Sequence, residues 1–304
     1  MFIEKRKSGK KTKYYLSYTF REGGKVKKKR KYLGINLSTE ELLRKRDEVE
    51  HEFFYEFKVP LFQFSLTKKE IQKLNKLDKE IKVRHFGRDE WEKFRNSFVY
   101  NTNAIEGSRV LEHEVPIILK KKVNLNSDEK ETQGLAKAVD YIKNHKGELS
   151  LTLIKKLHKL CFSRTKHFAG KFRDVEVVIR DGYGRIVHRG TPHEDLDLEL
   201  KKYISWYKKN KFKFKPLVLA SIMHNQFEFI HPFQDGNGRV GRLLLNFILL
   251  KNNYPPVDIQ QEDRLIYYRT LQEYQQNHNL DLTILFLIDQ YRKTMFEVTT
   301  KWRL

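Results

Sequence analysis

Two strongly apolar helical stretches, joined by a short turn, constrain the fold of this chain more than any other feature. Apolar residues recur at helical spacing over 219–230 and again over 240–247. Pro232 should end the first helix at about His231, because the residue before a proline is biased away from the helical region. The second helix should begin near Arg239. The sequence therefore predicts two buried helices with a bend between them.

The bend has the properties of an anion site. Residues 235–238 read Asp-Gly-Asn-Gly, a tight turn whose glycines can take positive φ and expose N–H groups at the start of the next helix. Arg239 and Arg242 stand at that start, where the helix dipole disfavours cations unless an anion is bound. Asp235 would repel a bare phosphate and so indicates a divalent cation, for which Mg²⁺ is suited. His231 could take a proton near neutral pH. A Walker phosphate motif is absent.

The segment "HPFQDGNGRVGR" resembles the H-P-F-x-[D/E]-G-N-G-R-x-x-R signature of Fic domain proteins at every specified position. The resemblance extends over about residues 97–290 and includes "LIKKLHKLCF", "AGKFRDVEVVI" and "RLIYYRTL". It implies a mainly α structure, the helical Fic fold with a β-hairpin flap. It also implies transfer of AMP from ATP to a Ser, Thr or Tyr hydroxyl of a target protein, or of the chain itself, with pyrophosphate leaving.

The same resemblance assigns roles to the matched positions. His231 corresponds to the general base that activates the target hydroxyl, and Asp235 to the Mg²⁺ ligand. The nucleotide-binding positions implied are Gly236, Asn237, Gly238, Arg239 and Arg242.

A second unusual charge lies at Glu106. It ends an apparent helix just before Gly107, where the negative end of the dipole disfavours a carboxylate. The stretch "TNAIEG", 102–107, is similar to the inhibitory [S/T]-x-x-x-E-[G/N] helix of Fic proteins, placed here near 97–106. The resemblance implies that Glu106 pairs with Arg242 and blocks productive ATP binding. An alternative role is to position a water that removes AMP from targets.

Residues 175–191 read as a β-hairpin inside an otherwise helical region, with two short β-type runs around 181–184. By its place in the chain it resembles the flap of Fic proteins, which holds a target segment near the catalytic histidine. An exposed edge strand could bind such a segment by main-chain hydrogen bonds.

The first 34 residues are strongly basic. They contain thirteen Lys or Arg against Glu4 and Glu22, which gives +11, half of the net charge of +22. Residues 13–20 and 26–34 predict a β-hairpin turned by Gly23-Gly24. Tyrosines interleaved with lysines could contact nucleic acid through phosphates and stacking. Charge alone is a weak signal, so a basic, solvated hairpin that keeps the protein soluble or docks on the main domain is the preferred interpretation. In the runner-up interpretation of the whole chain, this basic hairpin is the main activity of a nucleic-acid-associated regulator.

The expected organisation has three parts: a basic hairpin at 1–37, a helical connector at 38–95 opened by a Ser38–Glu41 capping box, and a Fic domain at 96–300. The helices expected in the last part are 89–105, 112–121, 128–145, 150–162, 193–209, 216–230, 239–252, 262–277 and 281–299. The single Cys161 excludes an intramolecular disulfide, and no run is long and apolar enough for a membrane span. We therefore expect a cytoplasmic protein without a membrane partner. The sequence leaves a homodimer open.

Overall fold

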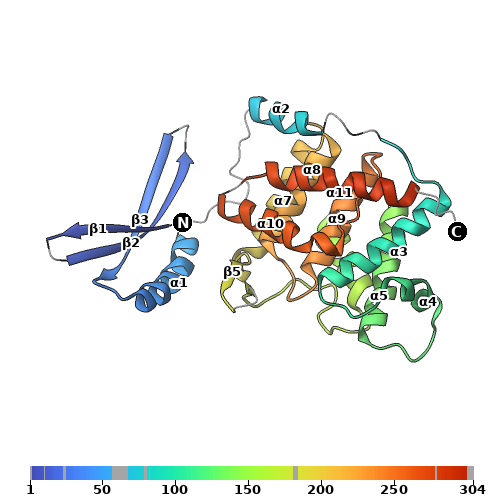
Figure 1. Ribbon diagram of the computed structural model, residues 1–304, viewed down its shortest axis with the longest axis horizontal. Coiled ribbons are helices and arrows are strands. Elements are labelled where there is room, and N and C mark those ends of the chain that lie inside the picture. Colours follow the sequence, from blue (N-terminus) through green and yellow to red (C-terminus); the bar gives the residue numbers. More distant parts are fainter. Residues whose placement is uncertain are drawn as a thin grey trace. The chain divides into compact units, whose positions relative to one another are not determined.

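The computed structural model describes residues 2–9, 11–22, 25–56, 68–78, 81, 83–180, 184–277 and 279–299. The chain divides into two compact units, residues 1–63 and 64–304 (Figure 1). The turn residues Gly23 and Gly24, and residues 181–183 of the predicted hairpin turn, lie outside the described residues.

The first unit is a three-stranded antiparallel sheet with a helix. Its strands β1 (Phe2–Ser8), β2 (Lys11–Glu22) and β3 (Lys25–Ile35) lie in the order β1-β2-β3, and α1 (Thr39–Glu56) follows. The predicted pairing of β2 with β3 is present, but the expectation of a two-stranded hairpin was wrong. Strand β1 adds a third strand through a turn at Gly9, which has φ of 63°. Four charged residues in "FIEKRKS" concealed this strand, and most of its side chains are exposed in the structure.

The capping box at the start of α1 is confirmed. The Glu41 carboxylate accepts from the Ser38 N–H at 2.9 Å, and the Ser38 hydroxyl accepts from the Glu41 N–H at 3.2 Å. The small core of this unit joins Leu16 and Leu33 of the sheet to Leu42 of the helix. One face of the sheet is therefore covered by α1.

The second unit is mainly α-helical, as predicted. Its helices are α2 (Lys68–Leu77), α3 (Arg88–Ile105), α4 (Val115–Lys120), α5 (Ser127–Asn144), α6 (Leu151–Phe162), α7 (Leu196–Asn210), α8 (Pro216–Ile230), α9 (Asn237–Lys251), α10 (Arg264–Asn277) and α11 (Asp281–Thr299). Short 3-10 turns at Glu112–Glu114, His193–Asp195 and Gln261–Asp263 precede α4, α7 and α10. In the described residues, none of the helices combines the length and the apolar character needed to cross a membrane.

Helices α8 and α9 form the centre of this unit (Figure 1). Every residue of α8 after Pro216 is buried, and α9 is buried from Val240 to Leu249. Helix α8 packs on α7, α9, α10 and α11, whereas α9 packs on α3, α5, α6 and α8. The predicted bend between two buried helices is thus held from several sides.

Candidate active site

The bend between α8 and α9 is a tight turn held by hydrogen bonds. His231 ends α8 in the left-handed conformation, with φ of 53° and ψ of 61°, and Gly236 has φ of 84°. The Asn237 side chain spans the turn: its oxygen accepts from the Phe233 N–H and its amide donates to the Phe233 carbonyl, both at 2.8 Å. Helix α9 begins at Asn237, two residues earlier than predicted. The first turn of α9 therefore carries Arg239.

His231 presents a free imidazole nitrogen. Its Nδ1 lies 3.3 Å from the Glu228 carbonyl oxygen, which can only accept a hydrogen bond. Nδ1 therefore carries the proton, and Nε2 keeps its lone pair. Burial lowers the pKa of His231 to about 4. The side chain is thus neutral near pH 7 and is able to accept a proton.

Arg173, which sequence reasoning did not single out, fixes the backbone around His231. Its Nε donates to the His231 carbonyl at 2.8 Å, and its Nη atoms donate to the carbonyls of Val175, Thr191 and Ile230. The residue is 5% exposed. The available signal in the sequence was the position of this arginine at the end of "AGKFR", just before the predicted flap.

A second residue that was not singled out, His158, supports the bend from α6. Its Nδ1 accepts from the Gly170 N–H at 2.8 Å, so its Nε2 carries the proton and donates to the Asp235 carbonyl at 3.0 Å. Its ring stacks on Phe233 with centroids 3.8 Å apart. Burial lowers its pKa to about 4, which keeps the ring neutral. The bend therefore begins at one neutral histidine, His231, and is supported by a second, the buried His158.

Glu106 and Arg242 form an ion pair. Arg242 Nη2 lies 2.7 Å from Glu106 Oε1, while its Nε and Nη2 donate to the hydroxyl and the carbonyl of Thr102 at 2.5 and 3.0 Å. Arg242 is 1% exposed, and the Glu106 side chain is 27% exposed. Burial would lower the pKa of Arg242, but the charge and hydrogen bond of Glu106, together with Tyr267 and Glu228, outweigh burial and raise that pKa. The guanidinium is therefore charged, and it donates hydrogen bonds to Thr102 and Glu106 at the C-terminal end of α3.

The Glu106 carboxylate also covers the start of α9. A Cβ atom on Gly238 would collide with Glu106 Oε1, so this glycine permits the carboxylate to lie directly over the helix N-terminus. A helix N-terminus attracts anions. Glu106 thus occupies the position that an external anion would take, and it does so while paired with Arg242.

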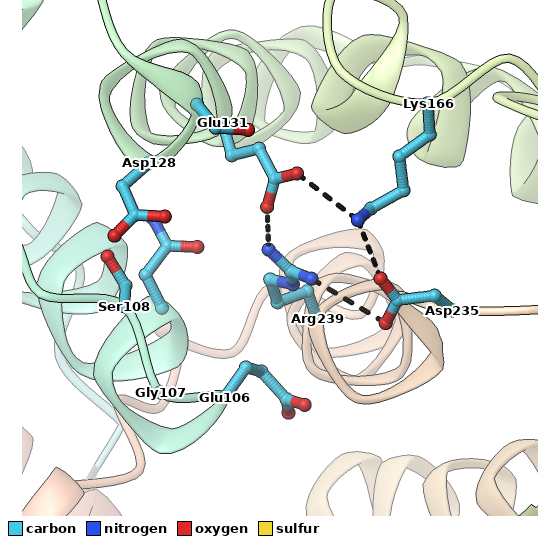
Figure 2. Close-up of a pocket in the computed structure, with 10 residues that line it drawn as sticks. Glu106, Gly107, Ser108, Asp128, Glu131, Lys166, Asp235 and Arg239 are labelled. Atoms are coloured by element: carbon cyan, nitrogen blue, oxygen red, sulfur yellow. Dashed lines mark hydrogen bonds and ion pairs between the residues drawn. The ribbon is translucent and has the colours of Figure 1, made fainter.

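Arg239 is also paired with a carboxylate, in a network shown in Figure 2. It contacts Glu131 of α5, a residue that the sequence reasoning missed. Lys166 lies 3.4 Å from the same carboxylate and 2.7 Å from Asp235. Burial raises the pKa of Asp235, but the Lys166 hydrogen bond and the Arg239 charge outweigh it, so the pKa lies below its usual value. Two cations and two carboxylates thus alternate around the opening of the bend.

These residues border a cavity of about 260 Å³. It is lined by Asn103, Glu106, Gly107, Ser108, Ser127, Asp128, Glu131, Lys166, Asp235 and Arg239. Four of these side chains are carboxylates and two are cations, so the cavity is acidic on balance. The acidic wall on α5, formed by Asp128 and Glu131, was not predicted from the sequence. Acidic residues near the start of a helix are usually solvated, so these two did not indicate a site.

The predicted site residues take different places around this cavity. Glu106, Asp235 and Arg239 line it, and Arg242 is buried behind Glu106. Asn237 is committed to the turn. His231 is not among the lining residues.

The predicted hairpin lies next to His231. Strands β4 (Val178–Arg180) and β5 (Ile186–Arg189) pair antiparallel, with Ile179 opposite His188. The His188 and His231 rings are 6.3 Å apart, and the Thr191 N–H donates to the Ile230 carbonyl at 3.1 Å. The hairpin is therefore joined to the backbone that holds His231.

Comparison with known proteins gives consistent similarities. Residues 148–249 match the Fic/DOC family. The chain is 31% identical over 191 residues to the protein adenylyltransferase Fic of Nematostella vectensis. That match covers 59% of this chain and 43% of the relative, so the chain spans less than half the length of the curated protein.

Two solved structures have the same fold. A Fic domain-containing signaling protein from Bacteroides thetaiotaomicron matches with a TM-score of 0.62 and 22% identity, over 76% of this chain and 94% of that one. A Fic-1 fragment from Caenorhabditis elegans matches with a TM-score of 0.60 and 21% identity, over 86% and 78% of the two chains.

Proposed function

The chain belongs to the Fic/DOC family, whose domain it carries at residues 148–249, and we propose that it transfers AMP from ATP to a hydroxyl side chain of a protein. The observation that carries the proposal is the segment 231–242, which comprises the bend and the start of α9. It combines a neutral imidazole with a free nitrogen, a helix N-terminus and two arginines within twelve residues. A relative that is 31% identical is named a protein adenylyltransferase.

In the proposed reaction, His231 Nε2 accepts the proton of the target hydroxyl. The hydroxyl oxygen forms a bond to the α-phosphorus of ATP, and the bond from that phosphorus to the bridging oxygen breaks. Pyrophosphate leaves with the electron pair, and AMP stays on the target. The Glu228 carbonyl holds the imidazole in the reactive tautomer, and Arg173 holds the carbonyl of His231.

The nucleotide phosphates would lie at the start of α9. The start of α9 presents backbone N–H groups from Asn237 onward, and Arg239 and Arg242 supply positive charge for the phosphate chain. The Gly236 N–H donates to the Asp235 carboxylate at 2.6 Å and would have to release it to contact a phosphate. This role requires both arginines to exchange the carboxylates that they contact here, Glu131 and Glu106, for phosphate oxygens.

Mg²⁺ fits this site as a companion of the nucleotide. In the described part of the chain, no group of three His, Cys, Asp or Glu residues could hold a metal by itself. Mg²⁺ is commonly bound by one or two carboxylates together with phosphate oxygens and waters. The Asp235 carboxylate, 49% exposed and facing the cavity, would supply one such ligand. When bound, the ion would neutralise charge on the phosphates. Lys166 would have to release Asp235 first.

We further propose that Glu106 restrains the reaction. Its carboxylate lies over Gly238 and pairs with Arg242, so a triphosphate and Glu106 would compete for one guanidinium. The target segment is proposed to add to the β4–β5 hairpin beside His231, where backbone groups of a short edge strand could hold it.

The test uses ATP labelled at either the α- or the γ-phosphate, in the Glu106→Gly background. Transfer of AMP predicts that protein, including the chain itself, acquires the α-label and none of the γ-label. The further change His231→Ala should abolish labelling, with melting temperature as the control for folding. Labelling from the γ-position, or persistence of α-labelling without His231, would contradict the proposal.

Two alternatives drawn from the sequence, a regulator acting mainly through the basic N-terminus and an enzyme that removes AMP, are not favoured by the names of the relatives. Residues 1–34 as a nucleic-acid contact, a homodimer and a cytoplasmic location stay predictions. Light scattering of the purified chain tests the homodimer.

A further inference from the structure

The sheet of the first unit has an open face that bears aromatic rings and cations together. The face opposite α1 is fixed by the register, in which Phe2 pairs with Ser17, Glu4 with Tyr15, and Tyr15 with Tyr32. The same register places Arg6, Lys13, Lys28 and Arg30 on this face. Alternation puts the buried Leu16 and Leu33 on the other face, against α1.

One carboxylate organises the cations of the open face. Glu4 lies 2.5 Å from Lys28 and 2.9 Å from both Arg30 and Arg6, and it accepts from Ser17 at 2.8 Å. Hydrogen bonds from Lys28, Arg30 and Ser17 hold the pKa of Glu4 well below its usual value. Glu4 is only 17% exposed, whereas its cations are 30–50% exposed. A single anion therefore holds three outward cations in place.

Exposed aromatic rings lie among these cations. Phe2 is 49% exposed and Tyr32 51% exposed. Lys28 lies 4.8 Å from the centre of the Phe2 ring, and Tyr15 contacts the Tyr32 ring at 5.5 Å. A solvated basic sheet made only for solubility does not require large exposed rings on its outer strands. Rings beside guanidinium and ammonium groups suit base edges and phosphates.

The arrangement fits duplex DNA better than a single strand. On the open face, cations come from all three strands: Arg6 on β1, Lys13 on β2, and Lys28 and Arg30 on β3. Two strand spacings make the backbone of the sheet about 10 Å wide, which fits the major groove, about 12 Å wide. Cations on three adjacent strands form a broad patch that suits the two phosphate backbones of a duplex, whereas a single strand needs one basic track.

We propose that the open face of the β1-β2-β3 sheet binds duplex DNA, with the sheet in the major groove and its cations on the flanking phosphates. This surface lies outside the Fic domain, and its function does not depend on AMP transfer.

The experiment measures fluorescence anisotropy of a labelled DNA duplex of about 20 base pairs with the full chain, across a salt series. We expect micromolar binding that weakens with salt, with a log–log slope of about −0.9 for each phosphate contacted. Lys28→Ala with Arg30→Ala should weaken binding at least tenfold and reduce the slope by about two. Tyr32→Ala should weaken binding several-fold. Because this side chain is 51% exposed, the variant should fold, and its melting temperature is the control.

A matched control removes the same charge elsewhere. Lys208 and Lys209 are exposed residues of α7 in the second unit, and changing both to Ala should leave affinity within twofold. Four results would overturn the proposal. These are no duplex binding at low salt, an equal loss in the control variant, tighter binding of a single strand of equal length, or displacement of the duplex by polyglutamate at equal charge.

Discussion

Arg239 and Arg242, unusual for a helix start, each contact a carboxylate in this structure. The pair of Glu106 with Arg242 was predictable, since both residues stand at the wrong end of a helix dipole and the motif resemblance joins them. The pair of Glu131 with Arg239 was not. Acidic residues near the start of a helix are ordinary, so nothing in the sequence separates Glu131 from a solvated residue. Only the packing of α5 against α9 brings it to the site.

The pH dependence of AMP transfer tests the state of His231. Protonated imidazole cannot accept the hydroxyl proton, and burial lowers the pKa of His231 to about 4. In the Glu106→Gly background, the rate is therefore expected to change little through His231 between pH 8 and pH 5.5, and to fall as pH approaches 4. Initial rates at saturating ATP and Mg²⁺ measure this. A loss centred near pH 6.5, the ordinary histidine value, would contradict the assignment.

A second prediction concerns Lys166, which we expect to compete with Mg²⁺ for Asp235. Its ammonium lies 2.7 Å from Asp235, where a divalent cation would bind. In the Glu106→Gly background, Lys166→Met should lower the Mg²⁺ concentration for half-maximal rate by about two- to fivefold, because an ion pair this exposed is worth up to about 1 kcal/mol. Lys171→Met, at an exposed position nine residues after the end of α6, is the control. An unchanged or higher Mg²⁺ requirement would show that Lys166 does not compete at Asp235.

At the scale of elements, the helices were the most predictable part. Apolar periodicity and capping residues placed each predicted helix of 89–299 within about three residues of its observed ends. Strand β1 was missed because it is an edge strand with four consecutive charged residues, so it lacks the apolar alternation that indicates a strand. The attachment of the β4–β5 hairpin was missed because it depends on Arg173, whose four carbonyl partners come from three separate segments.

Arg173 should act as a positioning residue. Arg173→Gln leaves several buried carbonyls without a charged donor, so we expect kcat for AMP transfer to fall at least tenfold while KM for ATP changes little. Stability should fall by about 2 kcal/mol or more, which lowers the melting temperature by about 4–8 °C. Arg173→Lys, which keeps the charge, should recover part of kcat. A rise in KM with unchanged kcat would place Arg173 at the nucleotide instead.

At the scale of the whole molecule, the chain consists of two units with separate cores. Charge predicted the basic character of the first unit but not its third strand. Motif spacing predicted the bend of the second unit but not the acidic wall of its cavity, which depends on tertiary packing.

Every residue of the proposed site belongs to the second unit. Removal of residues 1–63 is therefore expected to leave the rate of self-modification by the Glu106→Gly variant within about twofold, provided that the modified residue is mapped to the second unit by mass spectrometry. A drop of tenfold in a folded fragment would show that the first unit contributes to the reaction.

The most direct test of the account is the initial rate of AMP incorporation from α-labelled ATP by the wild-type chain and by Glu106→Gly. Competition between Glu106 and phosphate for Arg242 predicts that Glu106→Gly is at least about tenfold faster, equivalent to about 1.4 kcal/mol, with Glu106→Gln in between. Equal rates for all three proteins over a range of ATP and Mg²⁺ concentrations would contradict it.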